Sequence, residues 1–163
     1  MAIGIAFFNN ASSQFSVGAG VGTFNLTDGV SESRSGFNIS GGYALNETMT
    51  IGLNVGNYWK SLDVIGSSLT SFVRPVSVSF KNDFMEDAFR VYAGAELGLI
   101  AFGVSFGGES NSESYLGLGA IGGVKYLIND NINAFGEAKY QYIMLDNASE
   151  GAVLLNIGLN YTF

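Results

Sequence analysis

The chain has 163 residues and a net charge of −7, only 13% of its residues are charged, and it contains no histidine and no cysteine. A chain of this length is expected to form one domain, and its charged fraction is well below the roughly 25% that is usual for soluble domains. The missing residue types exclude Ser-His triads, two-histidine zinc sites, thiolate chemistry and disulfides, and the negative charge disfavours nucleic acid as a partner. We therefore expect no enzyme, no cofactor and no metal site.

The first thirteen residues differ from the rest of the chain. Large apolar residues alternate with glycine and alanine between Ile3 and Phe7, as in a strand. The apolar run is too short for the core of a signal peptide and has no basic residues before it, which indicates that any export signal has already been removed. Residues 1–13 are therefore either an extra strand or a separate N-terminal segment, and residues 14–163 form the domain.

From residue 14 onward, apolar residues alternate with small or polar residues at a period of two, which is typical of strands with one apolar face. In the last segment, for example, every second residue from Val153 to Phe163 is apolar. This alternation predicts eight strands of about 9 to 14 residues, a length that suits tilted strands in a membrane. The predicted strands are residues 14–24, 36–45, 49–59, 70–81, 88–100, 115–127, 132–143 and 152–163.

The connections between these strands are alternately short and long. The short ones are residues 46–48, 82–87 and 128–131, and the long ones, rich in Ser, Asn, Gly and acids, are 25–35, 60–69, 101–114 and 144–151. No stretch has the roughly 20 apolar residues of a membrane-spanning helix, so the chain can cross a bilayer only as a closed barrel. We therefore predict an all-β, up-and-down antiparallel transmembrane β-barrel with short periplasmic turns and long external loops. Residues 1–13 would lie in the periplasm unless they add a strand, which would break the even strand count of bacterial barrels.

Aromatic residues gather at the ends of the predicted apolar faces. Those expected near the periplasmic interface are Phe15, Tyr43, Phe80, Phe89, Tyr126, Tyr161 and Phe163, and those near the opposite interface are Phe37, Trp59, Tyr140 and Tyr142. Two aromatic girdles are typical of membrane barrels, although aromatic residues are also common in strands of any kind. We interpret these residues as interface aromatics.

The last strand ends in a recognisable pattern. Asn156, Gly158, Tyr161 and Phe163 provide a polar residue, a glycine and two aromatic residues two apart, with phenylalanine at the end. This pattern resembles the export signal of bacterial outer-membrane barrels, which the barrel-assembly machinery recognises. The strand pattern from residue 14 onward resembles the small OmpA/OmpX-type barrel domain. The resemblance implies an integral, porin-like protein of the outer membrane of a Gram-negative bacterium, in contact with lipid and lipopolysaccharide, and it implies no specific activity.

The predicted inward faces are unusually rich in glycine. The inward glycines are Gly18, Gly20, Gly22, Gly42, Gly52, Gly56, Gly94, Gly98, Gly117, Gly119, Gly123 and Gly158. Side chains just fill the interior of an eight-stranded barrel, so these glycines would either leave a narrow open lumen or make room for large inward residues such as Tyr92 and Phe135. We favour the second interpretation.

Charged residues are also expected in the lumen. The inward charged residues are Arg90, Glu96, Lys125, Glu137 and Lys139. Because charges in a confined interior must pair, we predict an ion-pair network among them. Such a network would act as a polar plug, or alternatively as the selectivity element of a narrow pore; we favour the plug.

The predicted external loops are acidic. Their acids are Asp28, Glu32, Asp63, Glu109, Glu113, Asp146 and Glu150. We favour the interpretation that these side chains are simply solvated; alternatively, they share divalent cations with lipopolysaccharide phosphates or meet a basic partner. Residues 107–114 form a candidate contact loop for a protein partner.

Three functions remain open. The first, which we favour, is a non-catalytic barrel with a structural or surface-interaction role through its external loops. The second is a narrow channel for small or apolar solutes. The third is a soluble, lipocalin-like ligand-binding barrel with its apolar residues inside, which is disfavoured because the other face has too few charges to meet water.

Overall fold

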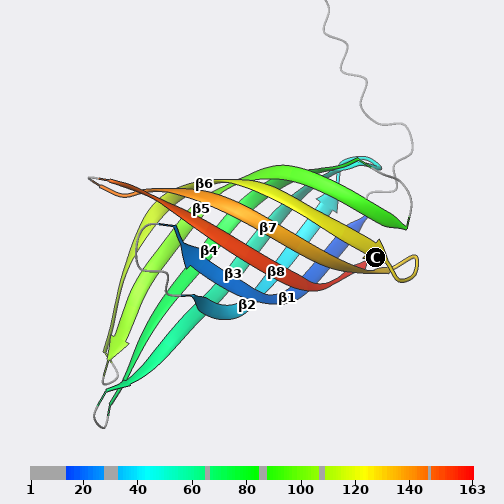
Figure 1. The fold of residues 1–163 in the computed structure, drawn as a ribbon. Coiled ribbons are helices and arrows are strands. Elements are labelled where there is room, and N and C mark those ends of the chain that lie inside the picture. The colour runs from blue at the N-terminus through cyan, green and yellow to red at the C-terminus, as the bar shows by residue number, and fades with distance from the viewer. Residues whose placement is uncertain (1–13, 28–32, 65–66, 85–87, 107–108, 147) are drawn as a thin grey trace, which may run out of the picture.

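The computed structural model describes residues 14–27, 33–64, 67–84, 88–106, 109–146 and 148–163. The described residues form eight strands: β1 (Phe15–Leu26), β2 (Arg34–Ala44), β3 (Met49–Val64), β4 (Ser67–Asp83), β5 (Phe89–Phe106), β6 (Glu109–Leu127), β7 (Ile132–Met144) and β8 (Ser149–Thr162). Each strand pairs with the next in antiparallel fashion, and β1 pairs with β8, so the sheet closes into a barrel (Figure 1). The predicted up-and-down barrel is confirmed. The prediction for residues 1–13 concerns residues outside the described ranges.

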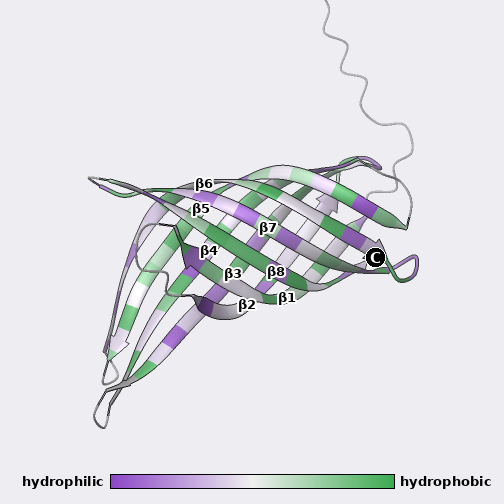
Figure 2. Ribbon diagram, in the orientation of Figure 1, coloured by the Kyte–Doolittle hydropathy of each residue, from purple (hydrophilic) through white to green (hydrophobic). Residues whose placement is uncertain are grey.

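Alternation of side chains decides what faces the lumen and what faces outward. Val21, Leu155 and Ile157 point away from the barrel, and Ile157 remains 65% exposed. Their neighbours Gly22 and Asn156 point inward and pair across β1 and β8. The same alternation of apolar and polar residues runs along the other strands (Figure 2). An apolar outer surface of this extent faces lipid, so the soluble, lipocalin-like alternative does not fit.

Four strands, β3 to β6, are much longer than predicted. The predicted loops 60–69 and 101–114 are wrong, because β3 and β4 continue to Val64 and Ser67, and β5 and β6 to Phe106 and Glu109. Residues 109–114 are Ser, Asn and Glu, which rarely favour strands, but pairing with β5 supplies their backbone hydrogen bonds and overrides that weak preference. The hairpins β3–β4 and β5–β6 consequently extend past the rest of the barrel, toward the lower left of Figure 1.

The opposite end of the barrel has tight turns. Asn46 Oδ1 accepts hydrogen bonds from the backbone N–H groups of Thr48 (2.9 Å) and Met49 (2.7 Å) between β2 and β3. Asn129 Oδ1 does the same for Asn131 (2.9 Å) and Ile132 (2.8 Å) between β6 and β7. These asparagine side chains satisfy the backbone groups of the turns and fix the register of the strands that follow. Short turns mark the periplasmic end of a bacterial barrel.

Candidate functional site in the barrel lumen

The lumen contains a layer of ion pairs near the middle of the barrel. Glu96 on β5 is fully enclosed, and its carboxylate receives three donors. Lys139 Nζ and Ser77 Oγ both lie 2.9 Å from Oε2, while Gln141 Nε2 donates to Oε1 at 2.7 Å. A buried carboxylate is tolerated only when it is paired and hydrogen-bonded in this way.

Glu137 on β7 is the second buried carboxylate. Lys81 Nζ contacts its Oε2 at 2.5 Å, and the Tyr92 hydroxyl donates to the same atom at 3.0 Å. Lys139 also reaches Glu137 Oε1 at 3.4 Å. Lys139 therefore bridges two carboxylates, which joins strands β5 and β7 across the intervening β6.

Asp83 at the end of β4 is the third carboxylate, and it lies closer to the periplasmic end. Lys125 Nζ is 2.6 Å from Asp83 Oδ2, and Arg90 Nη1 is 3.8 Å from the same atom. The Tyr92 ring lies between this group and Glu137, with the Lys125 Nζ 5.7 Å and the Lys81 Nζ 5.2 Å from its centroid. Cation–π contacts of this kind add to the ion pairs.

The structure divides the five predicted charged residues into two groups. Glu96, Glu137 and Lys139 lie together, whereas Arg90 and Lys125 gather around a carboxylate that was not predicted. Lys81 and Asp83 were missed, and the predicted turn at residues 82–87 was wrong at its start because β4 runs through Asp83. In the last part of β4 every second residue, namely Ser77, Ser79, Lys81 and Asp83, is polar, and this alternation could have placed Lys81 and Asp83 in the lumen.

An apolar layer fills the outer half of the lumen, and it was not predicted. Its seven members are almost fully enclosed and come from six strands: Phe24, Tyr58, Val73, Ile100, Ile143, Ala152 and Leu154. Phe102 and Tyr115 pack against this layer from the outer side. The Tyr58 hydroxyl donates to Asn156 Oδ1 at 2.7 Å, which connects the apolar layer to the polar one. We call these seven residues the apolar plug.

Several of the inward glycines lie beside large inward side chains. A methyl group at Gly158 would be 2.7 Å from the Phe135 ring, and one at Gly56 would be 2.7 Å from the Tyr58 ring. Both distances are far below van der Waals contact. This geometry supports the interpretation that glycine makes room for bulky neighbours in the lumen.

The residues predicted to act at the membrane surface lie on the outside of the barrel. The Phe15 and Tyr43 rings are in contact at the periplasmic end, with centroids 5.0 Å apart. The outward rings of the other interface aromatics in this prediction are largely exposed: Trp59, Phe80, Phe89, Tyr126, Tyr140 and Tyr142. In the predicted export signal, Tyr161 and Phe163 point outward and touch (5.0 Å), whereas Asn156 and Gly158 face the lumen.

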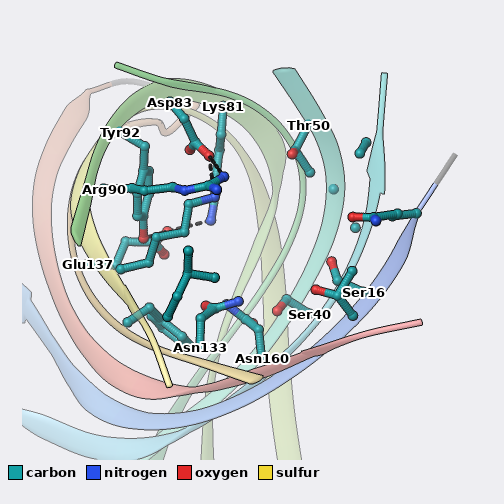
Figure 3. Close-up of a pocket in the computed structure, with 18 of the residues that line it drawn as sticks. Ser16, Ser40, Thr50, Lys81, Asp83, Arg90, Tyr92, Asn133, Glu137 and Asn160 are labelled. Carbon is teal, nitrogen blue, oxygen red and sulfur yellow. Dashed lines mark hydrogen bonds and ion pairs between the residues drawn. The ribbon is translucent and has the colours of Figure 1, made fainter. Parts of the chain in front are cut away.

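Below the ion pairs, the lumen widens into a cavity of about 790 Å³ that reaches the periplasmic turns. Figure 3 shows Lys81, Asp83, Arg90, Tyr92 and Glu137 gathered on one side of this cavity. Within the described ranges, the chain has no helix long and apolar enough to cross a bilayer. The described residues also contain no group of three or more acidic side chains placed to hold a metal ion.

Comparisons with known proteins agree with this architecture. The whole chain, residues 1–163, matches the family described as "Outer membrane protein beta-barrel domain". Neisserial surface protein A is 22% identical with a TM-score of 0.73, over 94% of this chain and 98% of that one. Ail, the attachment invasion locus protein of Yersinia pestis, solved with the heparin analogue sucrose octasulfate, is 18% identical with a TM-score of 0.68, over 94% and 100%. The N-terminal β-barrel domain of Pseudomonas aeruginosa OprF is 19% identical with a TM-score of 0.64, over 93% and 100%.

The likeness to these solved structures concerns the fold, since the sequence identities are low. A comparison with curated proteins found no match. The family match covers every residue of the chain and agrees with the apolar outer surface, the closed sheet and the short turns at one end. The chain therefore belongs to the outer membrane protein β-barrel domain family and is an integral protein of the bacterial outer membrane.

Proposed function

We propose that this barrel presents a protruding sheet to a partner outside the cell, and that it neither conducts solutes nor catalyses a reaction. The observation that carries the proposal is the position of the apolar plug. It fills the lumen at the level where β1, β2, β7 and β8 end, while β3 to β6 continue past it. A closed lumen favours a role for the outer surface, and the continuing strands supply that surface.

The protruding sheet has two open edges. Within the described pairings, β2 accompanies β3 only as far as Trp59, and β7 accompanies β6 only as far as Leu116. Residues 61–64 and 109–115 therefore have a strand on one side alone. Backbone groups along such an edge are able to pair with an extended segment of another chain.

The inner face of this sheet is apolar and acidic. Leu62 lies directly opposite Leu69, and Leu69 directly opposite Phe106, so the three side chains share one face. Leu62 and Phe106 are exposed there. Glu109 lies opposite Phe106, which adds a negative charge beside the apolar row. The complementary partner is a protein segment with apolar and basic side chains.

The charge at this end supports the same choice. The segments that the sequence predicts as external loops contain the acids Asp28, Glu32, Asp63, Glu109, Glu113, Asp146 and Glu150, and the bases Arg34 and Lys60. The heparin analogue in the Ail structure is a polyanion, a ligand class that these acids would repel. Divalent cations shared between some of these acids and lipopolysaccharide phosphates are a further expected contact.

A binding measurement tests this proposal. The barrel is embedded in nanodiscs and titrated with a basic amphipathic peptide and with a matched acidic peptide. We expect saturable binding of the basic peptide alone, weakened by Phe106→Ser and by Glu109→Gln. The control is Leu97→Ser on the lipid-facing side of β5, which should leave binding unchanged. Equal binding of both peptides, or equal effects of Phe106→Ser and Leu97→Ser, would contradict the proposal.

A further inference from the structure

The cavity below the ion pairs has two chemically different walls. Figure 3 shows the charged side chains on one side, and Ser16, Ser40, Thr50, Asn133 and Asn160 around the other sides. The cavity is accessible from the periplasmic end, where its lining includes residues of the short turns. At its inner end it stops at the ion-pair layer, and the apolar plug lies beyond that layer. It is therefore a blind site that opens to the periplasm.

The charged wall presents its cations to the cavity and keeps its carboxylates behind them. The side chains of Lys81, Arg90 and Lys125 are 23%, 27% and 22% exposed, whereas those of Asp83 and Glu137 are 8% and 2% exposed. All three cations also contact these carboxylates. A molecule that enters the cavity nevertheless meets mainly ammonium and guanidinium groups, which are the protein's usual partners for carboxylates and phosphates.

The described lumen network also has an excess of positive charge. Its cations are Lys81, Arg90, Lys125 and Lys139, and its carboxylates are Asp83, Glu96 and Glu137. The excess is one unit of charge, in an interior where water screens it less than at the surface. Among the described lining residues, Glu47 and Asp130 are the acids at the rim, and both are exposed at the turns, where solvent screens them.

The neutral wall offers hydrogen-bonding groups. Asn160 Nδ2 donates to Asn133 Oδ1 at 3.0 Å, which leaves further donor and acceptor capacity on both side chains. Asn38 lies deeper in the lining and is 7% exposed, and its Oδ1 has no hydrogen-bond partner among the described residues. Buried acceptors normally have a donor. That oxygen is itself enclosed, so the groups that a bound molecule meets are the other hydroxyl and amide groups of this wall.

We propose that this cavity binds a small polyhydroxylated anion, of the sugar-acid class, from the periplasm. The carboxylate would face Arg90 and Lys125, and the hydroxyl groups would face the serine, threonine and asparagine wall. A simple anion would leave the neutral wall without partners, and an uncharged sugar would make no use of the three cations on the opposite wall. The volume lies within the range of small-molecule sites, about 300–1,000 Å³.

The test uses the folded 163-residue chain in detergent micelles and isothermal titration calorimetry with three probes. Gluconate carries both a carboxylate and hydroxyl groups, glucose carries hydroxyl groups alone, and acetate carries a carboxylate alone. We expect gluconate to bind saturably and about tenfold more tightly than either of the others, a difference of about 1.4 kcal/mol. The shift in gel mobility on boiling verifies that each sample is folded.

Four variants separate the site from a general charge effect. Lys125→Gln and Arg90→Gln should each weaken gluconate binding about tenfold, whereas Asp83→Asn should strengthen it because it removes the competing carboxylate. Lys60→Gln on β3 removes a positive charge outside the cavity and should change nothing. The absence of saturable gluconate binding to the folded wild type would overturn the proposal. Equal losses in Lys60→Gln and Lys125→Gln, or equal affinities for gluconate and acetate, would also overturn it. If Asp83→Asn fails to fold, Lys125→Gln and Arg90→Gln still decide the question.

Discussion

Lys139 Nζ lies 2.9 Å from Glu96 Oε2, and both side chains are almost completely enclosed in the lumen. The pair joins β7 to β5 over the top of β6, where Gly119 has no side chain to obstruct it. A methyl group at Gly119 would lie 3.0 Å from Glu96 Cγ. The ion pair and the glycine beneath it therefore form one packed unit.

Removal of one member of this pair should be costly. Lys139→Met leaves Glu96 and Glu137 without their shared cation, and breaking a buried pair typically costs about 3–5 kcal/mol. We expect a drop of this order in the free energy of unfolding, measured by urea titration of the barrel in micelles. The double variant Glu96→Gln/Lys139→Met should lose less than the sum of the two single variants. Simple additivity would show that the two side chains are not coupled.

The apolar plug predicts a barrel that does not conduct. Planar bilayer recordings of the wild type should show no discrete conductance steps. Phe24→Ala combined with Tyr58→Ala removes two of the largest plug side chains and should open a path for small ions, at a stability cost of about 3–5 kcal/mol for each change. Val21→Ala, on the lipid-facing side of β1, is the control and should show no conductance steps. Conductance of the wild type would move the narrow-channel hypothesis to first place.

Two adjacent residues of β2 test which face meets lipid. Ile39 points outward and Ser40 lines the periplasmic cavity. Ile39→Arg places a charge in the hydrocarbon region and should cost about 2–4 kcal/mol near the bilayer midplane. Ser40→Arg places the same charge in a wet, roomy cavity and should cost much less. Unfolding free energies in lipid vesicles compare the two, and equal losses would contradict the assignment of faces.

Recognition by the barrel-assembly machinery remains a proposal, and Phe163 tests it. Phe163 and Phe15 are both exposed at the periplasmic end, at 68% and 60%, and each contacts one tyrosine ring. The packing lost in Phe163→Ala and Phe15→Ala is therefore similar. We expect Phe163→Ala alone to reduce the amount of assembled barrel in cells, while both variants refold equally well in micelles. Matching yields in cells would argue against a signal at the last residue.

The alternation of side chains explains why much of this molecule was predictable. A period of two assigns each residue of a strand to one face, and this placed Glu96, Glu137 and Lys139 in the lumen together. The same rule applied to β4 would also have placed Lys81 and Asp83 there. The pairing of Lys81 with Glu137 could not be predicted from the sequence, because it joins β4 to β7 and depends on the register of every strand between them.

The ends of the strands were the weakest part of the prediction. Residues 109–114 have the composition of a loop, and only the neighbouring β5 makes them a strand. The apolar plug was missed for a related reason. Phe24, Ile100 and Leu154 occupy the next inward positions after the polar inward residues of their strands. Because the lumen was expected to be polar throughout, these apolar residues were not assigned to it.

The closure of β1 against β8 also has a consequence for the order of events in folding. Seven of the eight strand pairs join neighbours in the chain and form as hairpins, but the seam from Ser16 opposite Thr162 to Leu26 opposite Ala152 joins the two ends of the domain. During synthesis β1 is made first and β8 last, so one edge of β1 stays unpaired until almost the whole chain has been made. Until the seam closes, both terminal strands expose backbone groups that would pair with any other open edge. The time between the first strand and the last is therefore the period in which this protein most needs protection from its own copies.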